Sequence, residues 1–172
     1  MAYADLNGVH NPSAGVNDAT AAWGDQIRDN QVFLATPPYA HAYKAAAQSI
    51  SDATSTRLTF DSERADTDTI HSTVTNTGRF TCVTAGYYEI FGAGNFAANS
   101  TGVRILQAYL NGASLDPFGD FEGTPNALVV CQLSVSFAYP LAVNDYVEFF
   151  VYQSSGGNLN ATFEAGIAFL GF

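Results

Sequence analysis

The chain has 172 residues, of which 13% are aromatic, and its 16 acidic side chains against 6 basic ones give a formal net charge of −10. This length fits one main domain plus an extension, large enough to bury a core without disulfides or metals. Because an acidic protein repels phosphate backbones and anionic lipids, we expect no nucleic-acid partner and no membrane partner.

The first 38 residues differ from the rest and are predicted to form an N-terminal arm. Residues 1–15 are turn-rich, and Asn17-Asp18 is typical of a helix cap. Apolar side chains then recur at roughly helical spacing. This spacing predicts one amphipathic helix over residues 18–34, which Pro37-Pro38 ends.

A lone helix of this length is marginal in water, so its apolar face needs a partner. That partner is the chain's own main domain, a sister subunit or another protein. We favour an anchor on another protein, because the turn-rich leader has little other use. The predicted docking residues are Trp23, Ile27, Phe33 and Leu34.

Residues 39–172 are predicted to form an all-β domain. Short runs rich in Val, Thr, Tyr and Phe are separated by turn signals such as Asn111-Gly112, which is typical of a tight hairpin. Many short strands between such turns predict an antiparallel sandwich or jelly roll. We expect strands over residues 57–60, 69–74, 79–84, 87–96, 104–110, 127–139, 146–153 and 161–172, a polar loop over 61–68 and a long loop over 116–125.

The late strands carry apolar side chains on both faces. In residues 147–152, for example, Phe150 and Tyr152 alternate with the aliphatic and aromatic residues of the opposite face. A monomeric antiparallel sandwich usually has a polar outer face, and apolar surface outside the core normally marks an interface. Cover by the chain's own arm would explain the same pattern, but we favour self-association. The predicted contact residues are Tyr88, Phe150, Tyr152, Leu170 and Phe172.

Residues 80–91 resemble the signature strand pair of the complement-globular-head and tumour-necrosis-factor superfamily. Phe80, Gly86 and Tyr88 match the family's spacing, whereas Ile90 stands where an aromatic residue is usual. The resemblance covers about residues 45–172. It implies a compact jelly roll that works as a trimer, and therefore a binding or building module and not an enzyme.

Two later segments add to this resemblance. Residues 141–147 are similar to the family's Gly-Asp-x-Val turn, with Asn144 in place of Gly, a change that the left-handed backbone region tolerates. Residues 169–172 resemble the family's closing strand, which ends near the subunit contact. The similarity therefore extends to the end of the chain.

Residues 17–34 carry a second resemblance, to the start of small structural proteins of tailed-bacteriophage virions. In those proteins a jelly roll of this type is often displayed on the particle. The resemblance implies an arm that docks on the major capsid protein or another virion protein, with a trimeric head facing outward. We therefore favour a homotrimeric capsid decoration or cement protein at the virion surface.

The alternative function is a receptor-binding head or tail-fibre tip that recognises a host surface glycan. Its candidate ligand residues are Asp116, Phe118, Asp120, Phe121 and Glu122. A cellular trimeric signalling ligand is less favoured, because the chain starts without a secretory signal and is expected to be made in the cytoplasm. An enzyme comes last, since we find no phosphate loop, nucleophile elbow or metal-protease pair.

Neither a cofactor nor a metal is expected. Residues 61–68 are acidic enough to gather calcium ligands, but a solvated loop is the favoured interpretation. Cys82 and Cys131 are interpreted as small buried hydrophobic residues. A disulfide between them requires their strands to lie side by side, which the sequence leaves open.

Overall fold

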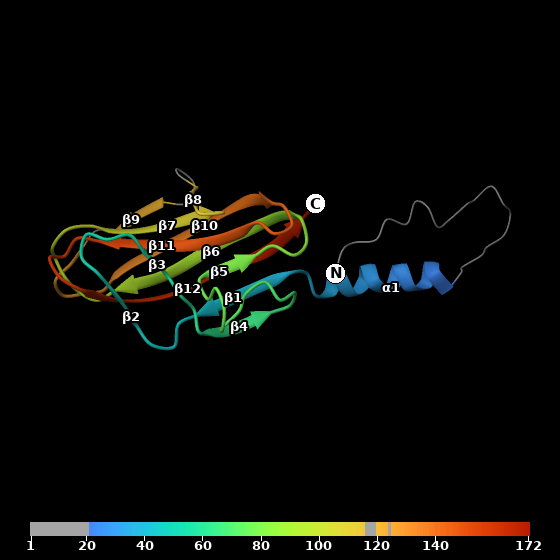
Figure 1. The fold of residues 1–172 in the computed structure, drawn as a ribbon, viewed down its shortest axis with the longest axis horizontal. Helices are drawn as coiled ribbons and strands as arrows, with labels where there is room; N and C mark the ends of the chain where they lie inside the picture. The colour runs from blue at the N-terminus through green and yellow to red at the C-terminus, as the bar shows by residue number, and fades with distance from the viewer. Residues whose placement is uncertain (1–20, 116–119, 124) are drawn as a thin grey trace.

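A computed structural model describes residues 21–115, 120–123 and 125–172. Within those residues the chain forms one helix and twelve strands, and Figure 1 shows the strands stacked in two layers. The helix and strands are α1 (Ala21–Ala35), β1 (Tyr39–Tyr43), β2 (Gln48–Ile50), β3 (Thr56–Arg57), β4 (Ser62–Asp66), β5 (Arg79–Thr81), β6 (Gly86–Phe96), β7 (Arg104–Leu110), β8 (Ala113–Ser114), β9 (Asp120–Gly123), β10 (Cys131–Leu141), β11 (Tyr146–Gln153) and β12 (Leu159–Gly171).

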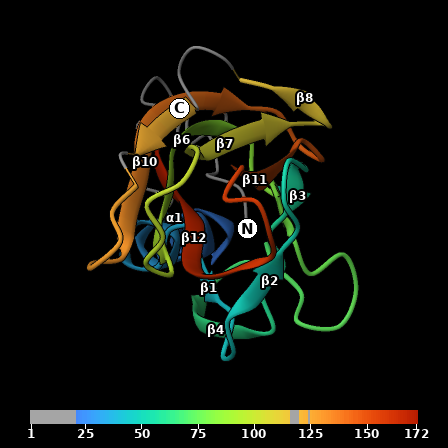
Figure 2. The ribbon, with the colours of Figure 1, turned by 90° about the vertical axis from the view of Figure 1, so that its left-hand side faces the viewer.

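Two antiparallel sheets make up the sandwich. In sheet 1 the order is β10-β6-β12-β1-β4, with β2 also pairing with β12. In sheet 2 the order is β3-β11-β7-β8, with β5 on β11 and β9 on β7. Figure 2 views the sandwich from the end opposite α1, with β4 below and β8 above. The antiparallel jelly-roll sandwich predicted from the sequence is confirmed.

Alternation along each strand separates the core from the outer faces. In β10, the buried residues Cys131, Leu133 and Val135 alternate with exposed polar residues. Facing residues of sheet 2, such as Val147 and Phe149 of β11, are completely buried. Burying such a side chain contributes roughly 1.5–3 kcal/mol, so the core between the two sheets is the main source of stability.

Some strand boundaries follow the sequence pattern closely, because their signals are local. The expected strands over residues 104–110 and 146–153 coincide with β7 and β11. Asn111 and Asn144 both have the positive φ angles that tight turns demand, 51° and 73°. The Asn111-Gly112 hairpin and the left-handed Asn144 are therefore confirmed.

Other segments differ from the prediction. Residues 62–66 form strand β4, not a loop, and residues 69–74 form no strand. The Asp66 carboxylate accepts hydrogen bonds from the backbone N–H groups of Asp68, Ile70 and His71. These donors are thereby engaged in a turn. Residues 120–123 of the expected loop form β9, and residues 127–130 lie outside the strands.

Helix α1 projects from one end of the sandwich, beside the end of the chain (Figure 1). Its described part, Ala21–Ala35, confirms most of the predicted helix. Phe33 is one contact that holds it: its ring is buried and lies 5.3 Å from the ring of Phe169 and 5.9 Å from that of Phe172. None of the helical segments that the structure describes is long and apolar enough to cross a bilayer.

Candidate functional site

Side chains that could act in catalysis or bind a metal are either far apart or already hydrogen-bonded to other residues of the chain. Among residues 21–115, 120–123 and 125–172, no three His, Cys, Asp or Glu side chains gather where they could hold a metal ion. Glu63 bonds to the Nδ1 atom of His71 at 2.7 Å, and Asp66 caps the following turn. Cys82 and Cys131 are free and buried. The surfaces of the sandwich are therefore the candidate sites.

The outer face of sheet 2 is aromatic at its centre. The rings of Tyr109 and Phe150 lie 4.3 Å apart, centroid to centroid, and Tyr152 pairs with Ile105 on the neighbouring strand. These side chains are half-buried within the single chain. Their apolar surface is thus partly used before any subunit contact forms.

A buried carboxylate joins three strands on this same face. Glu148 is 3% exposed, and its Oε1 atom accepts hydrogen bonds from Arg57 Nη1 at 2.7 Å and Arg79 Nε at 3.0 Å. The guanidinium of Arg79 in turn lies 4.0 Å from the ring centroid of Tyr146. This network links β3 and β5 to β11, which otherwise hold few backbone pairs.

A second surface surrounds the junction of α1 with the sandwich. We call it the helix-end surface and define it by its exposed apolar side chains: Val32, Leu34, Tyr87, Leu170 and Phe172. A cavity of about 290 Å³ opens there between α1 and the end of β12. Exposed apolar side chains grouped around a groove are typical of a protein interaction site.

The outer face of sheet 1 consists of rows of side chains that run across the strands. One row carries Ser136, Phe91, Gly166 and His41, and the next carries Ala138, Glu89, Ala168 and Tyr39. The rings of Phe91, His41 and Tyr39 lie within 6.4 Å of one another. A Cβ atom on Gly166 would approach the Phe91 ring to 2.6 Å, so glycine lets this ring lie against the strand.

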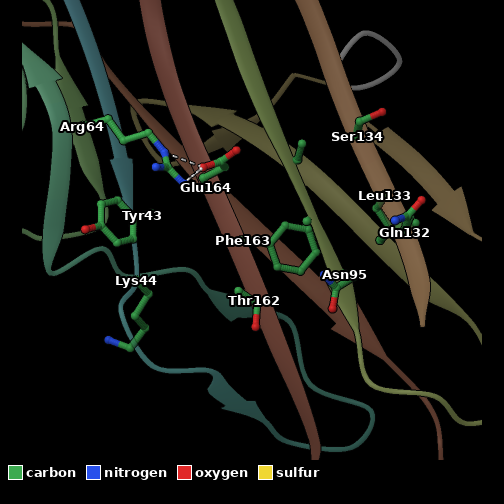
Figure 3. A pocket seen from close by; sticks show the side chains of 12 residues that line it. Tyr43, Lys44, Arg64, Asn95, Gln132, Leu133, Ser134, Thr162, Phe163 and Glu164 are labelled. Atoms are coloured by element: carbon green, nitrogen blue, oxygen red, sulfur yellow. Dashed lines mark hydrogen bonds and ion pairs between the residues drawn. The ribbon is translucent and has the colours of Figure 1, made fainter. Parts of the chain in front are cut away.

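Two further rows enclose a hollow of about 530 Å³ at the far end of the same face (Figure 3). One row is Gln132, Asn95 and Thr162, and the other is Ser134, Ala93, Glu164 and Tyr43. Arg64 of β4 closes one side, since its Nε and Nη2 atoms each lie 2.8 Å from Glu164 Oε2. This hollow was not predicted from the sequence.

The charged groups around the hollow are paired with each other. The guanidinium of Arg64 also lies 4.8 Å from the Tyr43 ring centroid. His41 Nε2 lies 3.4 Å from Glu164 Oε2 but makes no hydrogen bond in this arrangement. Lys44 donates a hydrogen bond to Thr59 Oγ1 and lies 3.7 Å from the Asp61 carboxylate.

No protein-family model matches the sequence, and no curated protein matches it. Solved structures do match. The globular domain of the zebrafish complement 1qA protein has a TM-score of 0.56 and 18% identity, covering 77% of this chain and 97% of that domain. The PRD1 vertex protein P5 has a TM-score of 0.58 and 14% identity, covering 78% of this chain and 98% of that one.

The fold is that of the complement globular head. The resemblance stated from Phe80, Gly86 and Tyr88 is therefore confirmed at the level of fold. At these identities the similarity establishes architecture alone.

The jelly roll places Tyr88 inside the subunit, which corrects its assignment to a trimer contact. Tyr88 is completely buried, its ring packs edge-on against Phe169 at 5.4 Å, and its hydroxyl donates to the Thr84 carbonyl at 2.7 Å. The residue faces the core because it alternates with exposed Tyr87 along β6. No surface of Tyr88 is left for a neighbouring subunit.

The other predicted contact residues divide between two surfaces. Phe150 and Tyr152 lie on the outer face of sheet 2, whereas Leu170 and Phe172 lie at the helix-end surface. The latter two line the same cavity as Leu34, which the sequence assigned to particle docking. The structure thus brings together residues for which the sequence predicts different partners.

The predicted docking residues are also unequal. Leu34 is 69% exposed, but Phe33 is buried against its own domain, so it positions the helix and is not free to dock. Trp23 and Ile27 are half-buried on α1. Of the candidate ligand residues, Asp116 and Phe118 lie outside the described residues, and Asp120, Phe121 and Glu122 are described only as the backbone of β9.

Proposed function

We propose that this protein is a homotrimeric structural component of a tailed-bacteriophage virion, decorating or cementing the capsid, and that its N-terminal arm (residues 1–38) docks the jelly-roll domain (residues 39–172) on the particle. The projecting helix α1 is the observation that carries this proposal. One of the similar structures is named a vertex protein, which supports a place on a virion.

Docking through α1 follows from its poor cover by the sandwich. A helix of 15 residues is marginal on its own, and within the described residues it is fixed to the sandwich near its last turn. Val32 and Leu34 remain exposed. A surface on the particle that covers these side chains would stabilise the helix, and the bound protein would stabilise the assembled shell by mass action.

A truncation tests the docking role, and the structure shows where to cut. The carbonyl of Pro37 accepts a hydrogen bond from Thr67 Oγ1, and that of Pro38 accepts one from Phe169 N. Removing residues 1–35 therefore keeps both anchors. We expect the truncated protein to fold and to lose binding to particles assembled without it, measured by co-sedimentation.

A point variant sharpens this experiment. Leu34→Lys places a charge on the exposed helix-end surface, whereas Asp25→Asn changes only a solvent-exposed ion pair with Arg28. The first variant should bind particles at least ten-fold more weakly, and the second should bind like the parent chain. Unchanged incorporation of both the truncation and Leu34→Lys would refute the anchor.

We assign the subunit contact to the outer face of sheet 1, at the rows of Phe91 and Tyr39 next to the helix-end surface. This area combines aromatic rings with small residues such as Ala138 and Ala168, so another subunit can approach closely. An ordinary association buries roughly 800 Å² per partner. The alternative contact is the face of sheet 2 that carries Phe150 and Tyr152.

Two matched variants distinguish these faces. Phe91→Ser and Tyr152→Ser each remove one half-buried ring from one outer face. Light scattering coupled to size-exclusion chromatography should report a trimer for the parent chain, dissociation for Phe91→Ser and a trimer for Tyr152→Ser. The reverse pattern assigns the contact to sheet 2, and a monomeric parent chain at high concentration contradicts the trimer altogether.

The second candidate function, a receptor-binding head, is favoured by one observation. The hollow on sheet 1 holds polar side chains such as Asn95, Gln132 and Thr162, and it lies near the start of β12, whereas α1 contacts Phe169 near the end of that strand. Particles that lack this protein should then adsorb poorly to their host. Normal adsorption by such particles would leave decoration as the function.

A further inference from the structure

The hollow on sheet 1 owes its shape to a small residue among larger ones. Ala93 lies at the centre of one row, between Ser134 and Glu164. Tyr43 and Arg64 lie at one end of that row, and the row of Gln132, Asn95 and Thr162 runs beside it. Its volume of about 530 Å³ falls within the roughly 300–1,000 Å³ of small-molecule sites.

Four side chains of the hollow have hydrogen-bonding groups that no described residue uses. They are Asn95, Gln132, Ser134 and Thr162. They come from three adjacent strands, β6, β10 and β12, yet the strand register sets them side by side (Figure 3). Amides and hydroxyls each both donate and accept hydrogen bonds, so together they match a partner whose groups do the same.

The charges of the hollow argue against an ionic ligand. Arg64 is paired with Glu164, and Lys44 lies beside Asp61, so each cation at the rim already has a carboxylate. A phosphate or other polyanion would also meet a chain of net charge −10. Among the described residues that line the hollow, a metal ion would find amide and hydroxyl groups but just one carboxylate, Glu164, which Arg64 already occupies.

We propose that this hollow is a binding site for a neutral saccharide. Sugar hydroxyls donate and accept hydrogen bonds, as Asn95, Gln132, Ser134 and Thr162 do. The Ala93 floor and the edge of Tyr43 offer apolar surface for the C–H groups of a sugar ring. The Arg64–Glu164 pair can add charge-assisted hydrogen bonds at the rim.

The position of the hollow keeps it accessible to molecules outside the particle; this step rests on the proposed docking through α1. Thr162 lies near the start of β12, whereas Phe169 contacts α1. Seven residues of strand span about 23 Å at ~3.3 Å each. In a protein docked by its helix, the hollow therefore lies on the part of the sandwich farther from the particle.

Titration of the full chain with neutral sugars tests the site. The probes are glucose, galactose, mannose, N-acetylglucosamine and lactose, followed by calorimetry or by saturation-transfer NMR into the millimolar range, where single-sugar sites are expected to bind. We expect at least one probe to bind. Asn95→Ala and Thr162→Ala should each weaken that binding about ten-fold, and Ala93→Leu should abolish it by filling the floor.

Asn160→Ala is the matched control, because Asn160 is exposed on the same strand two residues from Thr162 and does not line the hollow. It should bind like the parent chain. Absence of binding by every probe overturns the proposal, and so does binding that survives all three site variants. If Asn95→Ala instead shifts the trimer equilibrium without affecting sugar binding, the hollow is a contact between copies and the proposal fails.

Two further experiments identify the source of the sugar and distinguish the saccharide site from the docking through α1. Inhibition of particle adsorption by the binding sugar identifies a cell-surface glycan, whereas binding without inhibition identifies a free saccharide. Incorporation of the Asn95→Ala protein into particles is measured alongside. A sugar-site failure leaves incorporation intact, while a docking failure leaves sugar binding intact.

Discussion

The hydroxyl of Tyr88 is the clearest case of a side chain whose position in the fold decides its role. It is buried in the core and donates to the Thr84 carbonyl at 2.7 Å, and burial raises its pKa well above the usual range. The thiols of Cys82 and Cys131 are also buried, and desolvation raises the pKa of each. All three groups are therefore protonated in the folded chain at neutral pH.

Tyr88→Phe should destabilise the subunit by roughly 1–2 kcal/mol, because it removes a hydrogen bond and leaves the Thr84 carbonyl with only the weak thiol donor of Cys82. Urea unfolding followed by near-ultraviolet circular dichroism measures the change. Tyr87→Phe is the control, since Tyr87 is 52% exposed. Equal effects of the two changes would contradict the buried hydrogen bond.

The protonated thiols predict a fall in stability at alkaline pH. An unfolded cysteine loses its proton near pH 9.0, whereas these folded thiols keep theirs to higher pH. The unfolded state then binds fewer protons, so the free energy of unfolding declines as the pH rises above about 9. Urea midpoints at pH 8 and 10 should show this decline, and Cys82→Ala should reduce it.

The reactivity of Cys82 and Cys131 gives a second measure of their burial and raised pKa. Because the thiolate is the reactive form, both cysteines should resist iodoacetamide at pH 8 until the chain is unfolded. Rapid labelling of either thiol in the folded protein would contradict its burial and its raised pKa.

Among the elements, the short strands β3 and β5 depend on side chains more than on backbone pairing. Two register pairs join β3 to β11 and three join β5 to β11, and Glu148 connects both through Arg57 and Arg79. The two guanidinium groups are about a third exposed, so water weakens their attraction to the carboxylate.

Glu148→Gln should therefore lower the free energy of unfolding by roughly 1–3 kcal/mol, less than the roughly 3–5 kcal/mol of a fully buried pair. The loss should appear first as faster amide hydrogen exchange in residues 56–57 and 79–81. Asp25→Asn, which breaks an ion pair on the surface of α1, should leave stability unchanged within about 0.5 kcal/mol. An effect confined to α1, or none at all, would contradict the role of Glu148.

Local signals explain which elements the sequence predicted. Asn111-Gly112 and the alternation of residues 104–110 depend on neighbours in the chain, and both were predicted correctly. Strand β4 carries acidic residues at a sheet edge, so its composition resembles a loop. Phe33 looked like any apolar helix residue, and only the packing of Phe169 and Phe172 shows that it is already covered.

The hollow on sheet 1, by contrast, could not be predicted from local sequence patterns. Asn95, Gln132 and Thr162 lie far apart in the sequence, and they become neighbours through the register of β10, β6 and β12. No local pattern encodes that register. The aromatic alternation of Tyr39, His41 and Tyr43, by contrast, was present in the sequence and could have indicated an apolar outer face.

At the scale of the whole molecule, charge and association oppose each other. Each subunit carries a net charge of −10, so three copies in one trimer repel one another. The proposed contact holds the exposed carboxylate of Glu89, which accepts a hydrogen bond from Ser136 and lies in the same row as Tyr39. Apolar burial has to exceed this repulsion for a trimer to form.

The proposed trimer should therefore tighten as salt is raised. Increasing the ionic strength from about 10 mM to about 150 mM shortens the screening length from about 30 Å to about 8 Å, which weakens the repulsion between subunits. Sedimentation equilibrium at both salt concentrations should report a lower dissociation constant at the higher one. Glu89→Gln should reduce this salt dependence more than Asp25→Asn, which changes net charge equally but lies on α1. Weakening of the trimer by salt would instead mean that ion pairs between copies, and not apolar burial at Phe91 and Tyr39, hold the assembly together.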